Sequence, residues 1–190
     1  MAFPQSLRYR LYGRSICLVS FAVLFFALPI SLLATAPLSA ETKAYTSPDG
    51  ALRAIVVTKA TGESRVEFQA SAGQVLLSRD ERSSDGSHGY EVIEAAWTSD
   101  SQFFVATTES NGGHQPWARP LWVYSRSKNH IFELWKFGVS ATGIFTLKTP
   151  DITEVPILGC AGGGQSRILV FSLHRFLLTG RLPIAPCPGR

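Results

Sequence analysis

The sequence predicts an all-β fold, built from twisted antiparallel sheets that follow an N-terminal signal helix, in a chain of 190 residues. Two observations carry this prediction. Short apolar runs recur after residue 40 and are separated by turn-forming residues, and no stretch of ten or more residues between them has a helical period. The part of the chain from 41 to 190 is large enough for one domain with a core.

The first forty residues have the three regions of a secretory signal. A basic start contains Arg8, Arg10 and Arg14, an apolar run covers 16–33, and small residues follow up to Ala40. Cleavage after Ala40 is expected, because Pro37 disfavours an earlier cut. An uncleaved anchor is the alternative, since the apolar run is close to the length that spans a bilayer. Both interpretations predict a periplasmic or secreted domain, which contacts a membrane only through this segment if it stays attached.

The charge balance gives little support to nucleic-acid binding. The chain has 18 Lys and Arg against 14 Asp and Glu, and the signal region holds three of the arginines and none of the acids. Residues 41–190 are therefore almost neutral. Nucleic-acid binding draws most of its affinity from neutralised phosphates, so no nucleic-acid partner is predicted.

The strands are predicted in chain order from alternation and from turns. Polar and apolar residues alternate over 65–70, which places Val66, Phe68 and Ala70 on one face, and a Ser-Ala-Gly turn leads back into 75–77. Five polar residues, 125–129, connect 121–124 to 131–134 in the clearest hairpin of the chain. The remaining predicted strands are 52–57, 90–95, 102–107, 144–148 and 168–173.

A weak internal repeat occurs within this pattern. Thr46-Ser-Pro-Asp-Gly50 and Trp97-Thr-Ser-Asp-Ser101 both lead into a strand, and their aspartates, Asp49 and Asp100, are 51 residues apart. The first copy has the composition of a tight turn, whereas the second lacks both the proline and the glycine. A period of this length is typical of propeller blades.

At these residues the chain resembles the blades of TolB-type and WD-repeat-like propellers, over about 46–78 and 94–135. It also looks like exported bacterial proteins that share its Ser-Pro-Asp-Gly and Gly-Gly-His-Gln-Pro-Trp stretches, a resemblance that brings no activity with it. Closed propellers use at least four blades, and this chain has room for at most three. The resemblance therefore implies a propeller-blade-like or sandwich arrangement, or assembly with another copy, and a binding function more than chemistry.

Two long loops, 79–89 and 109–119, are the predicted functional regions. Each carries one histidine, His88 and His114, beside glycines that let the backbone approach a ligand. If the loops meet, the two histidines with Glu109 or Asp80 have the residue types of a metal site. The alternative is that the histidines only cap turns.

The predicted function is partner binding by a non-enzymatic exported domain. His88, His114, Gln115 and Trp117 are the expected ligand-binding residues, and the partner is an envelope or extracellular protein, a peptide or a glycan. Trp122 alternates with core positions and is expected to be buried. No cofactor and no catalytic residue is predicted, since the chain lacks a Gly-x-Ser-x-Gly nucleophile motif. The alternative is a small metal-dependent hydrolase that uses His88 and His114.

Two cysteines remain after the signal region, Cys160 and Cys187. In an oxidising compartment a disulfide between them is expected, and the loop it closes corresponds to about 3 kcal/mol of stabilisation in the chain-entropy model. The alternative is that one or both remain free thiols.

Overall fold

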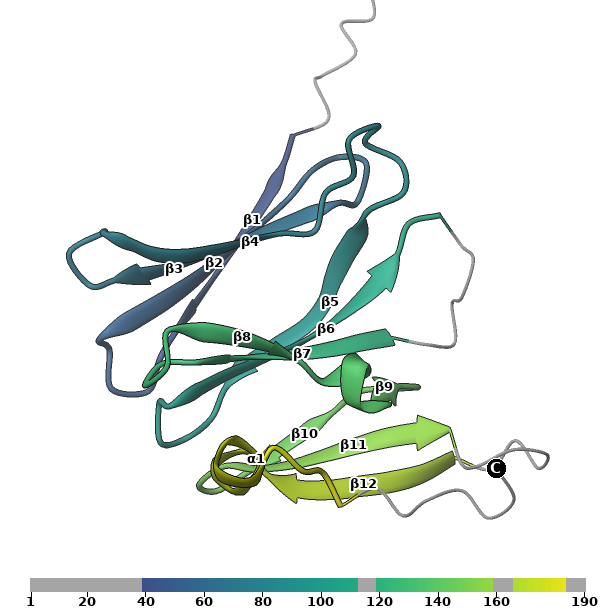
Figure 1. Ribbon diagram of the computed structural model, residues 1–190. Helices are drawn as coiled ribbons and strands as arrows, with labels where there is room; N and C mark the ends of the chain where they lie inside the picture. Colours follow the sequence, from purple (N-terminus) through teal and green to yellow (C-terminus); the bar gives the residue numbers. More distant parts are fainter. Residues whose placement is uncertain (1–38, 113–118, 159–165, 184–190) are drawn as a thin grey trace, which may run out of the picture. The chain divides into compact units, whose positions relative to one another are not determined.

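The computed structural model describes residues 39–112, 119–158 and 166–183 (Figure 1). These residues form strands that all pair antiparallel, so the all-β prediction is confirmed. All but the last two residues of the predicted signal segment lie outside the described ranges. Among the helices in these ranges, none has the length and apolar character that crossing a bilayer requires.

The first sheet is a four-stranded meander in chain order, which we call the first repeat. Alternation along its two central strands buries one face, as predicted, and Val66 and Phe68 on that face are fully buried. The strands are β1 (Glu41–Thr46), β2 (Leu52–Thr58), β3 (Ser64–Ala70) and β4 (Val75–Asp80).

The second repeat is another meander of four strands. Its last two strands form the predicted hairpin, in which Trp122 lies opposite Glu133. Trp122 is fully buried, which confirms that part of the prediction. The strands are β5 (Tyr90–Trp97), β6 (Phe103–Ser110), β7 (Arg119–Ser125) and β8 (His130–Glu133).

The third repeat has three strands, β10 (Thr146–Lys148), β11 (Ile152–Leu158) and β12 (Ser166–Ser172), followed by the helix α1 (Leu173–Thr179). A 3₁₀ helix, η1 (Leu134–Phe137), and the short strand β9 (Ser140–Ala141) precede it. Because β9 pairs with both β7 and β11, the second and third repeats share one eight-stranded sheet.

The first strands of the three repeats end at Thr46, Trp97 and Lys148, in two steps of 51 residues. The second step reaches Thr149-Pro-Asp151, a copy of the Ser-Pro-Asp turn that the sequence analysis missed. Asp151 directly precedes β11, whereas Gly50 and Ala51 separate Asp49 from β2. The repeat found in the sequence therefore corresponds to a repeated structural element. The structure adds a third copy at Asp151 to the two predicted copies at Asp49 and Asp100.

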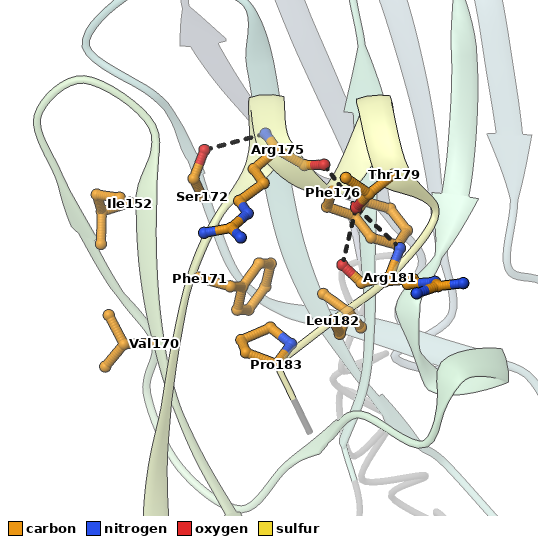
Figure 2. A pocket seen from close by; sticks show the side chains of 10 residues that line it. All are labelled: Ile152, Val170, Phe171, Ser172, Arg175, Phe176, Thr179, Arg181, Leu182 and Pro183. Carbon is orange, nitrogen blue, oxygen red and sulfur yellow. Dashed lines mark hydrogen bonds between the residues drawn. The ribbon is translucent and has the colours of Figure 1, made fainter. Parts of the chain in front are cut away.

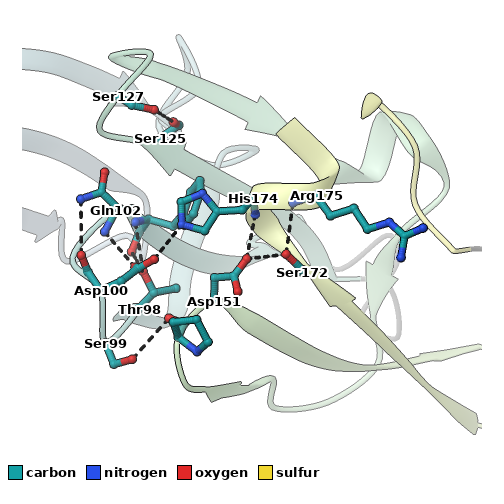
Figure 3. Close-up of polar contacts among 12 residues, drawn as sticks. Thr98, Ser99, Asp100, Gln102, Ser125, Ser127, Asp151, Ser172, His174 and Arg175 are labelled. Atoms are coloured by element: carbon teal, nitrogen blue, oxygen red, sulfur yellow. Dashed lines mark hydrogen bonds and ion pairs between the residues drawn. The ribbon is translucent and has the colours of Figure 1, made fainter. Parts of the chain in front are cut away.

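The first two turns have the same hydrogen bonds. Asp49 accepts one from the hydroxyl two residues before it (2.6 Å) and one from the N–H two residues after it (3.1 Å), and the matching distances at Asp100 are 2.6 and 3.0 Å. The residue after each aspartate has a positive φ, 72° at Gly50 and 61° at Ser101. Ser101 takes this conformation without being glycine, and its hydroxyl accepts a hydrogen bond from the Asp49 N–H at 3.0 Å. A hydrogen bond from the first turn to Ser101 therefore joins the first turn to the second, which is drawn in Figure 3.

The second repeat is buried on both faces. Along β6, Phe103 and Val105 belong to a core shared with the third repeat, whereas Phe104 and Ala106 belong to a core shared with the first. Burial on both faces explains why β6 is a continuous apolar run at its start and not an alternating one.

Besides the short η1 and β9, three elements were not predicted. The strand β1 is mostly exposed and polar, so it gives no alternation signal. The strand β11 contains Pro156, which disfavours a strand in sequence inspection. The helix α1 is shorter than the ten residues searched for, and it contains His174 and Arg175, which were interpreted as a strand end.

Two further predictions need correction. The predicted strand 144–148 begins only at Thr146, and Ile144 is 71% exposed. A core position was also expected for Trp97, the last residue of β5, but its side chain is only partly buried, against the core that the first two repeats share. Its indole N–H donates to the Tyr45 carbonyl at 2.8 Å, a contact between the first and second repeats.

Candidate functional site

The two loops singled out in the sequence lie together. The backbone N–H of Asn111, in the second loop, donates to the carbonyl of Gly89, at the end of the first loop, at 3.0 Å. The Asn111 side chain also bonds the carbonyl of Thr61, in the turn between β2 and β3. The loops therefore share one end of the two sheets, as the sequence interpretation required.

A buried carboxylate organises the first loop. Glu63 is fully buried, and its Oε1 accepts hydrogen bonds from the Ser83 hydroxyl and from the N–H groups of Gly89 (2.7 Å) and Ser83 (3.3 Å). The Ser83 hydrogen bond is the largest influence on the pKa of Glu63, which is lowered although burial opposes this. A Cβ at Gly89 would lie 2.6 Å from this oxygen, so the close approach requires glycine. Sequence inspection missed Glu63, which no motif marks.

His88 has the role of a turn residue. Its ring Nδ1 lies 2.5 Å from Asp85 Oδ2 and 3.0 Å from the Ser87 hydroxyl, and its side chain is 62% exposed. The hydrogen bonds of Asp85, first that from the Ser83 hydroxyl, lower the pKa of Asp85 strongly. The geometry of His88 agrees with the capping alternative.

The other residues predicted to bind a metal or a ligand either pair with arginines or lie outside the described residues. Glu109 pairs with Arg119 at 3.2 Å, and Asp80 pairs with Arg82, so both carboxylates are already neutralised. His114, Gln115 and Trp117 lie outside the described residues, as do Cys160 and Cys187. Within the described ranges, no group of three or more His, Cys, Asp or Glu side chains is arranged to hold a metal ion.

A cleft of about 530 Å³ lies where the two loops leave the sheets. Every strand from β4 to β9 contributes to its wall, together with η1. Charged and aromatic side chains dominate the lining, in which the main residues are Arg79, Asp80, Glu81, Tyr90, Glu133 and Trp135.

Arg79 is fixed in this wall by three contacts. Its Nε bonds Glu81, its Nη1 lies 3.0 Å from Glu133 Oε1, and its guanidinium carbon is 5.2 Å from the centre of the Trp122 ring. Glu133 also pairs with Lys136, and these two cations, Lys136 foremost, lower the pKa of Glu133. An arginine held between two carboxylates and an aromatic face has a fixed direction for its remaining N–H groups.

Two aromatic side chains of the cleft are open to solvent. Trp135 is 43% exposed and Tyr90 is 38% exposed. The ammonium of Lys136 lies 5.5 Å from the centre of the Trp135 ring. Sequence inspection singled out Trp117 for such a role and missed Trp135, which the fold brings to the cleft from η1.

A second polar cluster joins the turns of the second and third repeats to α1 (Figure 3). His174 Nε2 lies 2.8 Å from Asp100 Oδ2, whereas the Ser172 hydroxyl bonds Asp151 at 2.5 Å and accepts from the Arg175 N–H at 3.1 Å. The histidine ring and the serine hydroxyl therefore bond different aspartates. This arrangement caps a helix and is not a nucleophile with its base.

No protein-family model matches this chain, and no curated protein matches it.

Proposed function

We propose that residues 41–190 form an exported binding domain without catalytic activity, and that its ligand site is the cleft below the loops 79–89 and 109–119. The observation that carries the proposal is the pairing of exposed Trp135 and Tyr90 with a fixed network of charges around Arg79. Exposed aromatic side chains beside fixed polar groups are typical of recognition sites.

The charges of the cleft favour binding over acid–base chemistry. Asp80, Glu81 and Glu133 each pair with a cation, and the pairs of Asp80 and Glu133 stabilise these two carboxylates as anions, which makes them weak proton acceptors. A general base needs a pKa close to the working pH, but the pKa values of Asp80 and Glu133 are lowered, that of Asp80 to about 2.

The same groups suit a glycan among the three partner classes. Arg79 offers donors and the carboxylates offer acceptors within one cleft, so hydroxyl groups find both kinds of hydrogen-bond partner. The apolar face of a sugar ring can pack on Trp135 or Tyr90. A strongly charged peptide would bind more weakly, because the charged groups of the cleft are already paired with each other and offer it no free opposite charge.

The test is a saccharide array probed with the purified protein and with two variants. We expect one class of oligosaccharide to bind, and Trp135→Ala to weaken that binding at least tenfold, as truncation of a central aromatic contact does. Phe137→Ala is the matched control, since Phe137 is 46% exposed in the same η1 segment but does not line the cleft. Absence of any saccharide binding, or equal losses in both variants, would refute the proposal.

A further inference from the structure

Within the described residues, the third repeat lacks the strand that completes the other two. In the first repeat β3 lies between β2 and β4, and in the second repeat β7 lies between β6 and β8. In the third, β12 pairs with β11, and the described residues contain no strand along its other edge. An unpaired strand edge presents N–H and C=O groups that can pair with another chain.

The third turn aspartate is hydrogen-bonded differently from the first two. Asp49 and Asp100 accept hydrogen bonds inside their own turns, whereas Asp151 Oδ2 accepts from the Ser172 hydroxyl and from the His174 N–H (2.8 Å). Ser172 in turn caps α1. The chain thus enters a helix at the point where β3 and β7 enter a turn toward a fourth strand.

A groove of about 550 Å³ lies between the end of β12, α1 and residues 181–183 (Figure 2). On one side of β12 are Ile152 and Val170, and on the other are Phe171, Phe176 and Leu182. Val170 is 48% exposed, and its neighbour on the same face of β12, Ile168, is 66% exposed. Apolar side chains on both sides of an open strand edge are what an added strand, with its alternating side chains, would cover.

The groove is also basic. Arg175 bonds Ser172 through its backbone N–H at one end of the groove, and Arg181 lines the groove from the segment after α1; within the described residues neither takes part in an ion pair. The occupant should therefore carry carboxylates at that end. A second copy of β12 would not supply them, because neither β12 nor α1 contains an acidic residue. The chain's own end is a poor strand, since prolines recur at Pro183, Pro186 and Pro188.

We infer that β12 binds an extended peptide from a partner protein as a fourth, antiparallel strand, with acidic residues at the start of that peptide. The antiparallel direction follows the fourth strands of the other repeats. It places the first residues of the peptide beside Ser172 and therefore beside Arg175, with Arg181 in the same groove. This site is independent of the proposed cleft, because the two share no lining residue.

The test is fluorescence anisotropy of a labelled peptide, Glu-Glu-Val-Thr-Val-Thr-Val-Thr with blocked ends, added to the full-length protein. We expect saturable binding. N-methylation of alternate residues distinguishes strand addition from other binding: one alternate set should abolish binding and the other should leave it intact, because only one edge of the peptide faces β12.

Exchanging the charges of the groove and of the peptide tests whether the groove selects acidic residues at the start of the peptide. The double variant Arg175→Glu/Arg181→Glu should weaken binding roughly tenfold and should bind a peptide that starts Lys-Lys instead. Lys128→Glu, at the exposed β7–β8 turn, is the matched control and should bind as the unaltered protein does. Trp135→Ala should leave this binding unchanged even if it abolishes binding in the cleft.

Three outcomes would overturn the inference. They are the absence of peptide binding, an equal effect of both N-methylated sets, and a stable dimer in sedimentation that the double variant dissociates. The last outcome would make a second copy the occupant.

Discussion

Arg79 holds the cleft together, and Arg79→Met tests that role most directly. The side chains of Arg79, Glu81 and Glu133 are 18%, 8% and 21% exposed, so this network lies between the surface and the interior. Breaking a buried pair costs about 3–5 kcal/mol, whereas an exposed pair contributes at most about 1 kcal/mol. Methionine restores part of the packing against Trp122. We therefore expect Arg79→Met to lower the free energy of unfolding by about 2–3 kcal/mol at pH 7.

The loss should depend on pH. The lowered pKa of Glu133 contributes stability that is present above its unfolded pKa and is lost as pH falls through the folded value. Part of that contribution requires Arg79, so the difference between the two proteins should shrink below about pH 4. Urea unfolding followed by tryptophan fluorescence at pH 7 and pH 3 measures both values. Arg53→Met, on β2 and outside the cleft, is the control. An equal difference at both pH values, or a loss below 1 kcal/mol at pH 7, would refute the assigned role.

Two predictions concern a core contact between the first two repeats and the cap of α1 in the third. Phe68→Ala should destabilise by about 3–5 kcal/mol in the same urea assay, since Phe68 is fully buried and stacks on Tyr124 with ring centres 3.8 Å apart; the exposed Phe137→Ala should cost far less, and similar losses in the two would contradict the assignment of this core. Ser172→Ala removes the cap of α1 and should cost about 1 kcal/mol. Its measurable sign is faster amide hydrogen exchange within α1, whereas unchanged exchange there would show that Asp151 alone holds the helix start.

Local patterns were sufficient to predict much of the fold. Alternation found β3, and the polar segment between two apolar runs found the β7–β8 hairpin, because both signals are contained within a few neighbouring residues. The spacing of Asp49 and Asp100 found a true repeat. The third aspartate of the repeat, Asp151, was missed, and the structure shows that its carboxylate bonds residues at the start of α1.

The candidate site was predicted only in part. The two loops were identified from their length and their glycines, and their described ends meet at Gly89 and Asn111. The side chains expected to act there were the histidines, yet His88 caps a turn, and His114, Gln115 and Trp117 lie outside the described residues. Arg79, Glu133 and Trp135 had no signal, because each is an ordinary residue near the end of a strand until the fold brings the three together.

The sequence by itself determined the class, the strands with clear alternation and the position of the loops, since these follow from the period of the backbone and from turn chemistry. Only the tertiary structure decided which carboxylates neutralise Arg79, one of them 54 residues further along the chain. It also decided that the third repeat ends in a helix and leaves β12 with one partner among the described strands. Contacts between distant residues depend on how the repeats pack, and no window of neighbouring residues contains that information.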